Sequence, residues 1–340
     1  MDTISSLSVP LDENFDVCSS SFFQRFKQLP SPDEVRSHAR DQYLAGTNWG
    51  NNRRRVVTGY NARPAPSVFK SMGVFVKWGS DMRIAEGQTL YAIRHHLKKK
   101  TITVPEIYGW RTDQGEVFLY MEVISGRTLE QAWQEMDASN RLRICSELRT
   151  SFDDLRKFQK SAVGKYIGNI ARGPLYDRAI SLKYMAEAGP FTSVKEFHDW
   201  FTNLFKRLVP DPENIPNPYR QDLSDDFEIV FTHKDLHPSN IILSSSDPPR
   251  VLAIIDWEQP GWLPAYWEDR KAHYTCSYTG AWSETYLPII LGQYKETWDP
   301  WDWYTTSMGC CILRAAEEVR IAVSALRTHE LASSILQPSS

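Results

Sequence analysis

The feature that most constrains the fold of this chain is a change in its hydrophobic pattern near residues 121–126. Before it, short runs rich in β-branched and aromatic residues alternate with turn residues, at 54–58, 67–72, 74–78, 106–110 and 117–123. After Gly126, apolar residues recur every three or four positions, as in amphipathic helices. The pattern predicts an α+β fold with two lobes, a small antiparallel-sheet lobe followed by a larger, mainly helical lobe.

The 340 residues allow one large domain or two closely joined ones. We expect an N-terminal extension with a short helix (1–43), the small lobe (44–124) and the helical lobe (125–340). Helices are predicted from Ser31 or Asp33 through Tyr43, from Ser80 to about residue 99, over 139–159, and after a cap at Ser193 with Glu196 in the capping-box position. A strand hairpin is expected to interrupt the helices over residues 229–255.

Composition excludes several classes of protein. The 39 basic and 42 acidic residues give a net charge of -3, so there is no basic footprint for nucleic acid. No apolar stretch is long enough to cross a bilayer, and the polar residues 1–16 do not resemble a secretion signal, so we expect a cytoplasmic location. Five cysteines without metal-type spacing argue against a disulfide framework or a zinc site.

The strongest chemical signal lies in the segment 232–243, where Asp235 is followed five residues later by Asn240. Asp can accept a proton from a substrate hydroxyl, and an Asn oxygen can bind Mg²⁺. A second carboxylate, Asp256, follows the apolar run 251–255, and with Asn240 it would make a hard-oxygen metal site. The alternatives are a polar turn between strands and an Asp that caps the next turn.

The small lobe offers a matching cation. Lys77 lies in the apolar run 74–78, where an unpaired ammonium group would be costly, and Glu86 shares a helical stripe with Leu90 and Ile93. Pairing the two satisfies both, and a Lys held in this way can reach the α and β phosphates of ATP. Alternatively, each side chain is separately solvated.

In these residues the chain resembles the aminoglycoside phosphotransferase (APH) family of small-molecule kinases, which have a protein-kinase-like fold, and particularly its fungal-type members. The matching stretches are 74–77, 86–90, 104–110, 121–129, 189–191, 233–240, 254–267 and 271–272. They cover most of residues 70–275 in the order found in the family.

The resemblance implies a role for each matching residue. Asp235 would be the catalytic base, Lys77 and Glu86 the ion pair that positions phosphate, and Asn240 and Asp256 the metal ligands. Further expected contributions are an adenine pocket at Met121, backbone hydrogen bonds to the base from Glu122 and Ile124, an auxiliary carboxylate at Glu258, a structural His233, and an anchor for the catalytic loop at Glu268 or Asp269.

Some positions depart from the family pattern. The segment 58–66 has one Gly and two Pro in place of a glycine-rich phosphate loop, and Lys234 stands where relatives often have Gly. The absence of Asp-Phe-Gly and Ala-Pro-Glu segments argues against a protein kinase. We expect the arginines at 53–55 to lie on a solvated strand face and the cysteines at 310–311 to pack in a helix.

The resulting hypothesis is an ATP- and Mg²⁺-dependent kinase that phosphorylates a hydroxyl of a small molecule. Two alternatives stay open: a kinase-like binding protein without phosphotransfer, and an enzyme that phosphorylates transiently to drive elimination, cyclisation or ligation.

Seven of the twelve tryptophans fall between Trp257 and Trp303. Those up to Trp267 are expected to be scaffold around the site, and the later ones either core or the lining of an acceptor pocket.

Overall fold

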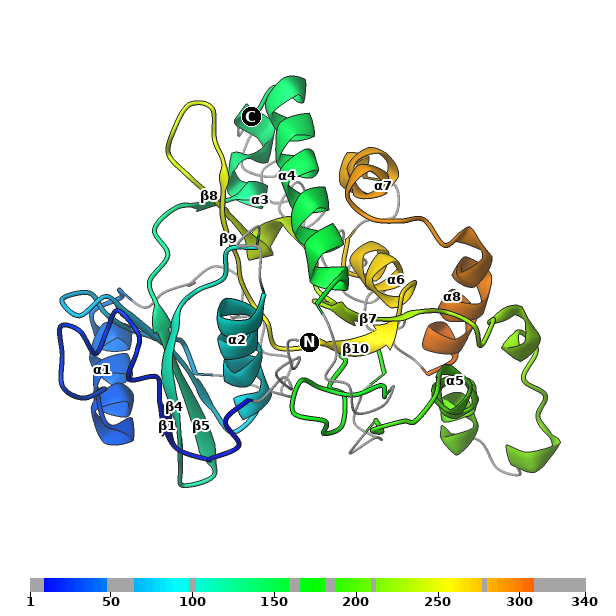
Figure 1. The fold of residues 1–340 in the computed structure, drawn as a ribbon, viewed down its shortest axis with the longest axis horizontal. Helices are drawn as coiled ribbons and strands as arrows, with labels where there is room; N and C mark the ends of the chain where they lie inside the picture. Colours follow the sequence, from blue (N-terminus) through cyan, green and yellow to red (C-terminus); the bar gives the residue numbers. More distant parts are fainter. Residues whose placement is uncertain are drawn as a thin grey trace, which may run out of the picture.

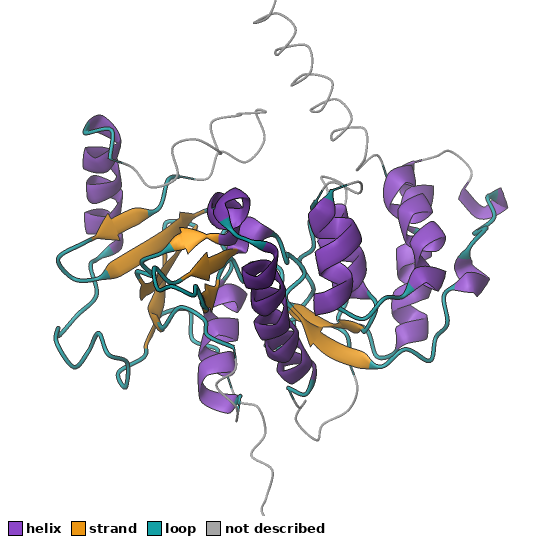
Figure 2. Cartoon of the chain, turned by 90° about the horizontal axis from the view of Figure 1, so that it is seen from above, coloured by secondary structure: helices purple, strands orange, loops and turns teal. Residues whose placement is uncertain are grey.

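The computed structural model describes residues 9–47, 64–97, 102–158, 166–180, 188–208, 212–276 and 280–308. Most strands gather on one side of the molecule and most helices on the other, as Figures 1 and 2 show from two directions. The predicted α+β fold with two lobes is therefore confirmed. The run at 54–58, the arginines at 53–55 and the cysteines at 310–311 lie outside the described residues.

Five strands form the sheet of the small lobe: β1 (Phe15–Asp16), β2 (Ser67–Phe69), β3 (Val74–Gly79), β4 (Ile107–Asp113) and β5 (Glu116–Glu122). They are antiparallel and lie in the order β1-β4-β5-β3-β2. Along β3, Val74 and Val76 are fully buried on one face, while Lys77 points to the other face and stands opposite Leu119 of β5. The runs predicted at 67–72, 74–78, 106–110 and 117–123 all occur as strands.

The N-terminal residues belong to this lobe rather than extending from it. β1 pairs with β4, and α1 (Pro32–Leu44) contacts β2. Ser31 caps α1 through a capping box with Glu34, as one of the two predicted starts requires. Phe22, which the sequence pattern did not single out, is completely buried in the core of the lobe.

The next helix, α2 (Ile84–His96), begins three residues later than predicted, because Arg83 and not Ser80 is its N-cap. Arg83 makes no side-chain capping bond. Gly87 allows α2 to approach the sheet closely, because a Cβ there would lie 3.0 Å from a ring carbon of Trp110. This close approach brings the N-terminal turn of α2, with Glu86, towards Lys77 of β3.

The large lobe is mainly helical. Its α-helices are α3 (Leu129–Ala132), α4 (Ala138–Arg156), α5 (Val194–Thr202), α6 (Trp267–Tyr274), α7 (Leu287–Ile290) and α8 (Trp298–Ser307). Its strands are β6 (Arg127–Thr128), β7 (Ile229–Thr232), β8 (Ile241–Leu243), β9 (Val251–Ile254) and β10 (Gly261–Pro264). They form two small sheets, β6-β8-β9 and β7-β10.

The predicted hairpin of residues 240–243 and 251–255 is confirmed, but the strand at 229–232 that leads into it has a partner that was not predicted. β8 and β9 do form an antiparallel hairpin, but β7 pairs with β10, a strand that was not predicted. The partners of β7 lie about thirty residues along the chain, and a local pattern carries no information on such a pairing. The consequence is that the segment between β7 and β8 crosses from one sheet to the other.

The helices α5 and α4 were both predicted, but the N-terminal cap of α5 and the start of the buried face of α4 differ from expectation. At α5, Ser193 accepts the amide of Glu196, but the Glu196 carboxylate accepts from Thr192 instead of closing a capping box. On α4, apolar residues recur every three or four positions from Leu142 to Leu155, which predicts one buried stripe; Leu148 is buried, whereas Leu142 is 49% exposed. The first turns of α4 extend beyond the packed core, so the stripe begins one turn later than its periodicity suggests.

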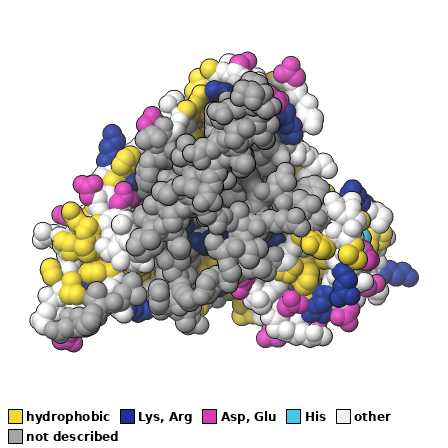
Figure 3. Space-filling model, turned by 180° about the vertical axis from the view of Figure 1, so that it is seen from behind, with side chains coloured by type: hydrophobic (Ala, Val, Ile, Leu, Met, Phe, Trp, Pro, Cys, Tyr) yellow, Lys and Arg dark blue, Asp and Glu magenta, His cyan; other side chains and the backbone are white. Residues whose placement is uncertain are grey.

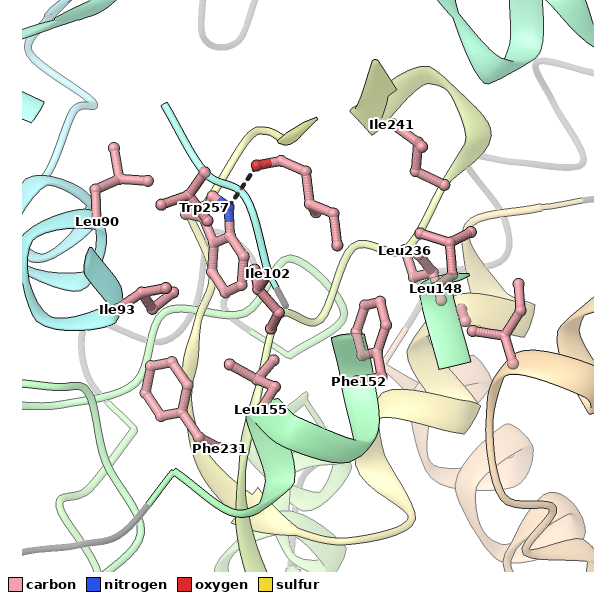
Figure 4. Packing of buried hydrophobic residues seen from close by; sticks show 14 of the residues in the cluster. Leu90, Ile93, Ile102, Leu148, Phe152, Leu155, Phe231, Leu236, Ile241 and Trp257 are labelled. Atoms are coloured by element: carbon pink, nitrogen blue, oxygen red, sulfur yellow. Dashed lines mark hydrogen bonds between the residues drawn. The ribbon is translucent and has the colours of Figure 1, made fainter. Parts of the chain in front are cut away.

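A single buried cluster connects the two lobes beneath the site. It runs from Leu90 and Ile93 of α2 through Trp257 to Leu148 and Phe152 of α4, and Figure 4 shows these side chains converging. Burial of this kind contributes most of the favourable free energy of folding. The relative positions of the two lobes are therefore fixed by the core as well as by polar contacts.

The surface is mixed in charge. On the face shown in Figure 3, acidic and basic side chains of the described residues are interspersed. Among the described residues, no helix combines the length and the apolar character needed to cross a bilayer.

The difference between Leu148 and Leu142 is testable. Leu148→Ala should lower the free energy of unfolding by about 2–5 kcal/mol, because it opens a cavity in the shared core. The matched control Leu142→Ala should change it by less than about 0.5 kcal/mol, because this side chain is largely solvated. Urea unfolding followed by tryptophan fluorescence measures both. Equal effects would contradict the described packing of α4.

Candidate active site

Lys77 is held between two carboxylates. Its Nζ donates to Glu86 Oε1 at 2.7 Å and to Asp256 Oδ1 at 2.5 Å. Glu86 belongs to the same lobe, and its pairing with Lys77 is the one that the sequence predicts. Asp256 follows β9 of the large lobe, so its bond to Lys77 joins the two lobes across the candidate site.

Burial and charge act in opposite directions on this triad. Burial alone would lower the pKa of Lys77, but the negative charges of Asp256 and Glu86 raise it above its ordinary value. Burial raises the pKa of Glu86, and the charge of Lys77 opposes that rise. Lys77 is therefore permanently cationic at neutral pH, as a group that binds phosphate must be.

The imidazole ring of His233 holds the segment between β7 and β8 in place through two hydrogen bonds to backbone groups. His233 Nδ1 accepts the amide of Asp235 at 3.2 Å, so its Nε2 carries the proton and donates to the carbonyl of Ile255 at 3.1 Å. Burial lowers the pKa of His233, which keeps the ring neutral. The ring thus holds backbone on both sides, as expected of a structural His.

A carboxylate from α6 anchors the same segment from behind. Glu268 accepts the amide of His233 at 2.6 Å and that of Lys234 at 3.1 Å. Asp269, the other residue considered for this role, bonds instead to Arg270 at 2.8 Å. Glu268 is thus the anchor of the segment 233–240.

Lys234 explains one departure from the family pattern. Its φ of +66° lies in the left-handed region, which Gly adopts without strain and Lys does not. The side chain is fully buried, and its Nζ donates to the carbonyl of Tyr176 at 2.8 Å and lies 3.6 Å from Asp177. Burial lowers the pKa of Lys234 to about 8. The contacts of the Lys234 ammonium group with Tyr176 and Asp177 offset the backbone strain at this position, which a Gly would not have.

Asp177 is a site residue that the sequence reasoning missed. It is completely buried, and it accepts hydrogen bonds from Lys271 Nζ and from the indole nitrogen of Trp267, both at 2.8 Å. The neighbouring Arg178 donates to Glu258 at 2.6 Å, so the auxiliary carboxylate is engaged by an arginine. The only sequence feature that could have indicated these contacts is the pair of adjacent charged residues at 177–178, and their partners lie 80 to 94 residues further along the chain.

Asp235 is partly buried at the centre of this arrangement. Burial and the nearby charge of Asp256 raise its pKa to about 6, against an ordinary value of 3.8. A carboxylate with a raised pKa is a better proton acceptor than an exposed Asp. Its environment therefore suits the role of base implied by the resemblance.

Asn240 and Asp256 fit a Mg²⁺ site. The amide of Ile255 donates to the carbonyl of Asn240 at 2.8 Å, which places the two candidate ligands at the same end of the β8–β9 hairpin. Asn240 Nδ2 donates to the carbonyl of Asp235 at 2.9 Å, so the amide oxygen faces away from that carbonyl. No group of three or more His, Cys, Asp or Glu in the described residues could hold a metal. The other ligands would be phosphates and water, as is usual for Mg²⁺.

The expected adenine site is partly occupied by protein contacts. Met121 is buried at the end of β5. The amide of Glu122 donates to the carbonyl of Glu106 at 2.8 Å, so a base bound here would use the carbonyl of Glu122 and the backbone of Ile124. Of the loop expected over the phosphates, only residues 64–66 are described.

The tryptophans of the C-terminal part are mainly packing residues. Trp257 stacks edge-on against His233 with ring centroids 4.4 Å apart, and Trp267 is fully buried, so both are scaffold as expected. Trp301 is also fully buried, and Trp282 packs against Trp133. These contacts favour the core interpretation over an acceptor pocket.

The anchor formed by Glu268 gives a prediction. Glu268→Ala should lower the free energy of unfolding by about 2–4 kcal/mol, because it leaves two buried amides without an acceptor. Glu268→Gln is the matched control and should cost less, since one amide oxygen can still accept. Chemical unfolding of both variants measures the difference, and identical stabilities would contradict the anchoring role.

Comparisons with known proteins agree with this geometry. The sequence model of the phosphotransferase enzyme family, APH, matches residues 84–304. The matched range contains Glu86, Asp235, Asn240 and Asp256 and begins after Lys77. A search of curated protein sequences gave no match.

Several solved structures are similar to the chain. A thermostable mutant of aminoglycoside phosphotransferase APH(4)-Ia is 12% identical, with 74% of this chain and 90% of that chain covered and a TM-score of 0.43. APH(2")-IIa in a ternary complex with streptomycin and ATP is 12% identical, with 83% and 99% covered and a TM-score of 0.42. APH(3'')-Id from Streptomyces rimosus, with ADP and streptomycin, is 15% identical, with 72% and 90% covered and a TM-score of 0.39.

These structural likenesses are distant, so the assignment rests on the sequence match. Because that match spans residues 84–304, well over half of the chain, the protein belongs to the phosphotransferase enzyme family.

Proposed function

We propose that this phosphotransferase moves the γ-phosphate of ATP to a hydroxyl of a small molecule and requires Mg²⁺. The observation that carries the proposal is the triad of Lys77, Glu86 and Asp256 beside the loop that holds Asp235 and Asn240. A buried cation, a hard-oxygen pair and a carboxylate of raised pKa are the parts that phosphoryl transfer needs.

Each group has a distinct task in this mechanism. Lys77, oriented by Glu86, binds the α and β phosphates, and Asp235 orients the acceptor hydroxyl and receives its proton as the oxygen bonds to the γ-phosphorus. The bond from phosphorus to the β–γ bridging oxygen breaks, and ADP leaves. Mg²⁺ bound by Asn240 and Asp256 would neutralise phosphate charge. Positioning and electrostatics supply most of the rate.

The bond between Lys77 and Asp256 has to rearrange when nucleotide binds. Both groups are engaged with each other at 2.5 Å, whereas phosphate needs the ammonium and the metal needs the carboxylate. Glu86 holds Lys77 from within the small lobe, so the cation would keep its position if Asp256 became a metal ligand. We infer that MgATP exchanges one direct contact between the lobes for contacts through the phosphates.

Asp235→Asn tests the proposed base. The variant should bind ADP with an affinity close to that of the parent, because Asp235 faces the acceptor, and should lose turnover by at least about a hundredfold. A screen of a metabolite extract with γ-labelled ATP identifies the acceptor, and product mass shows whether phosphate is retained. Full activity in Asp235→Asn would disprove the assignment.

The raised pKa of Asp235 also predicts an effect on stability. The pKa of Asp235 is 3.8 in the unfolded chain and about 6 in the folded protein, so between these two pH values the folded protein holds a proton on Asp235 that the unfolded chain has lost. The contribution of Asp235 to the free energy of unfolding therefore falls as the pH rises from about 4 to about 6. At pH 7.5, Asp235→Asn should therefore raise the melting temperature. Asp226→Asn, at an exposed position, is the control and should leave it unchanged. A lower melting temperature in Asp235→Asn would contradict the buried-charge argument.

The pH dependence of catalysis follows from the same group. The value of kcat/KM should rise with pH and level off above about 6, because only the deprotonated Asp235 accepts the hydroxyl proton. A metal held by Asp256 would reduce the repulsion between the carboxylates of Asp256 and Asp235, so kcat should level off at a lower pH than kcat/KM. A profile that falls between pH 5 and pH 7 would rule out this base.

A further inference from the structure

A cation from each lobe contacts the side chain of Tyr176 beside the candidate site. Arg83, the N-cap of α2 in the small lobe, places its guanidinium 3.6 Å from the ring centroid of Tyr176 in the large lobe. Such a distance corresponds to direct stacking of a cation on an aromatic face. Arg83 is exposed, and its Nη1 donates to the carbonyl of Asp81 at 3.2 Å.

Arg178, from the large lobe, interacts with the hydroxyl of the same tyrosine rather than with its ring face. Its Nη2 donates to Glu258 at 2.6 Å. The Arg178 side chain is 46% exposed, whereas Glu258 is almost fully buried. A guanidinium has five N–H donors, so a single carboxylate leaves part of this group available to a ligand.

The local charges do not cancel. Arg178 is balanced by Glu258, but no carboxylate of the described residues lies within 4.0 Å of Arg83. Lys77 differs in this respect, because Glu86 and Asp256 both bond to it. Among the described residues, the exposed guanidinium of Arg83 therefore lies at the surface without an ion-pair partner, next to the half-exposed Arg178.

This positive charge lies close to the reacting groups. Lys234, the residue before Asp235, donates to the carbonyl of Tyr176 at 2.8 Å, so Tyr176 lies against the loop of the candidate base. The positive charge of Arg178 also opposes the rise in the pKa of Asp235. Glu258, its partner, follows the candidate metal ligand Asp256 by two residues. A molecule whose hydroxyl approaches Asp235 therefore comes within reach of Arg178.

We propose that Arg83 and Arg178, held together on Tyr176, bind an acidic group of the acceptor, a carboxylate or a phosphate, and so select an anionic acceptor. The assignment to the acceptor rests on the proposed function. Arginine suits this task because its planar donors match carboxylate and phosphate oxygens in pairs. An acceptor carrying several amines would instead meet two like charges at this point, which is unfavourable.

The anion site can be tested without knowing the acceptor. Inorganic phosphate is titrated into the full-length protein saturated with MgADP, at constant ionic strength set with chloride, and its binding is followed by ³¹P NMR line broadening. We expect saturable binding, weakened about tenfold or more in Arg83→Gln and in Arg178→Gln, as for the loss of a charge-assisted hydrogen bond. Arg149→Gln, a surface arginine on α4, is the matched control and should bind phosphate normally.

A second arm identifies the source of the anion. With MgAMP-PNP in place of MgADP the γ-phosphate position is filled, so continued phosphate binding assigns the site to the acceptor. Binding that disappears in this arm overturns that assignment and gives the site to the γ-phosphate. The absence of saturable binding, or binding that survives both arginine substitutions, overturns the site itself.

A third variant separates binding from folding. Arg178→Gln leaves Glu258 buried without its arginine, so the double variant Arg178→Gln/Glu258→Gln removes both charges together. It should have a melting temperature near that of the parent and should still fail to bind phosphate. The assay needs no turnover, and Asp235→Asn should bind phosphate at least as tightly as the parent, because it removes a nearby negative charge. Failure of the anion site is therefore distinguishable from failure of the proposed kinase activity.

Discussion

The arrangement of the site depends on the ammonium group of Lys77, which two carboxylates from different lobes share. Glu86 holds it from α2, and Asp256 holds it from the end of β9. A buried ammonium is stable only when it is paired, so this contact fixes how α2 lies against the sheet and how the lobes face each other. The close approach at Gly87 and the shared core beneath make the same geometry favourable for packing.

The catalytic loop is held rigidly by bonds to its backbone. Glu268 accepts the amides of His233 and Lys234, and the His233 ring links the amide of Asp235 to the carbonyl of Ile255. Lys234 is accommodated in a left-handed conformation by its buried contacts with Tyr176 and Asp177. Rigid support matters because phosphoryl transfer depends on positioning more than on covalent participation by the protein. The segment 176–178 thus supports the loop through Tyr176 and Asp177 and carries Arg178, one of the two arginines of the proposed anion site.

Much of the site could be predicted because its signals are local. A lysine in an apolar strand and a glutamate on the buried stripe of the following helix each need a partner, and the structure pairs them. Asp235, Asn240 and Asp256 stand at the ends of short elements whose hydrophobic runs are evident in the sequence. The cap of α1 at Ser31 is equally local, since its partner Glu34 lies three residues away.

The sequence alone determined the two-lobed α+β class and which polar residues need partners, because periodicity and the cost of burying charge are properties of short segments. Only the tertiary structure decided the pairing of β7 with β10, the exposure of Leu142, and the contacts of Asp177 with Lys271 and of Arg178 with Glu258. The partners of β7, Asp177 and Arg178 are about thirty to ninety-five residues apart in the chain. Such contacts are chosen by how the lobes pack as a whole, and no local pattern records that choice.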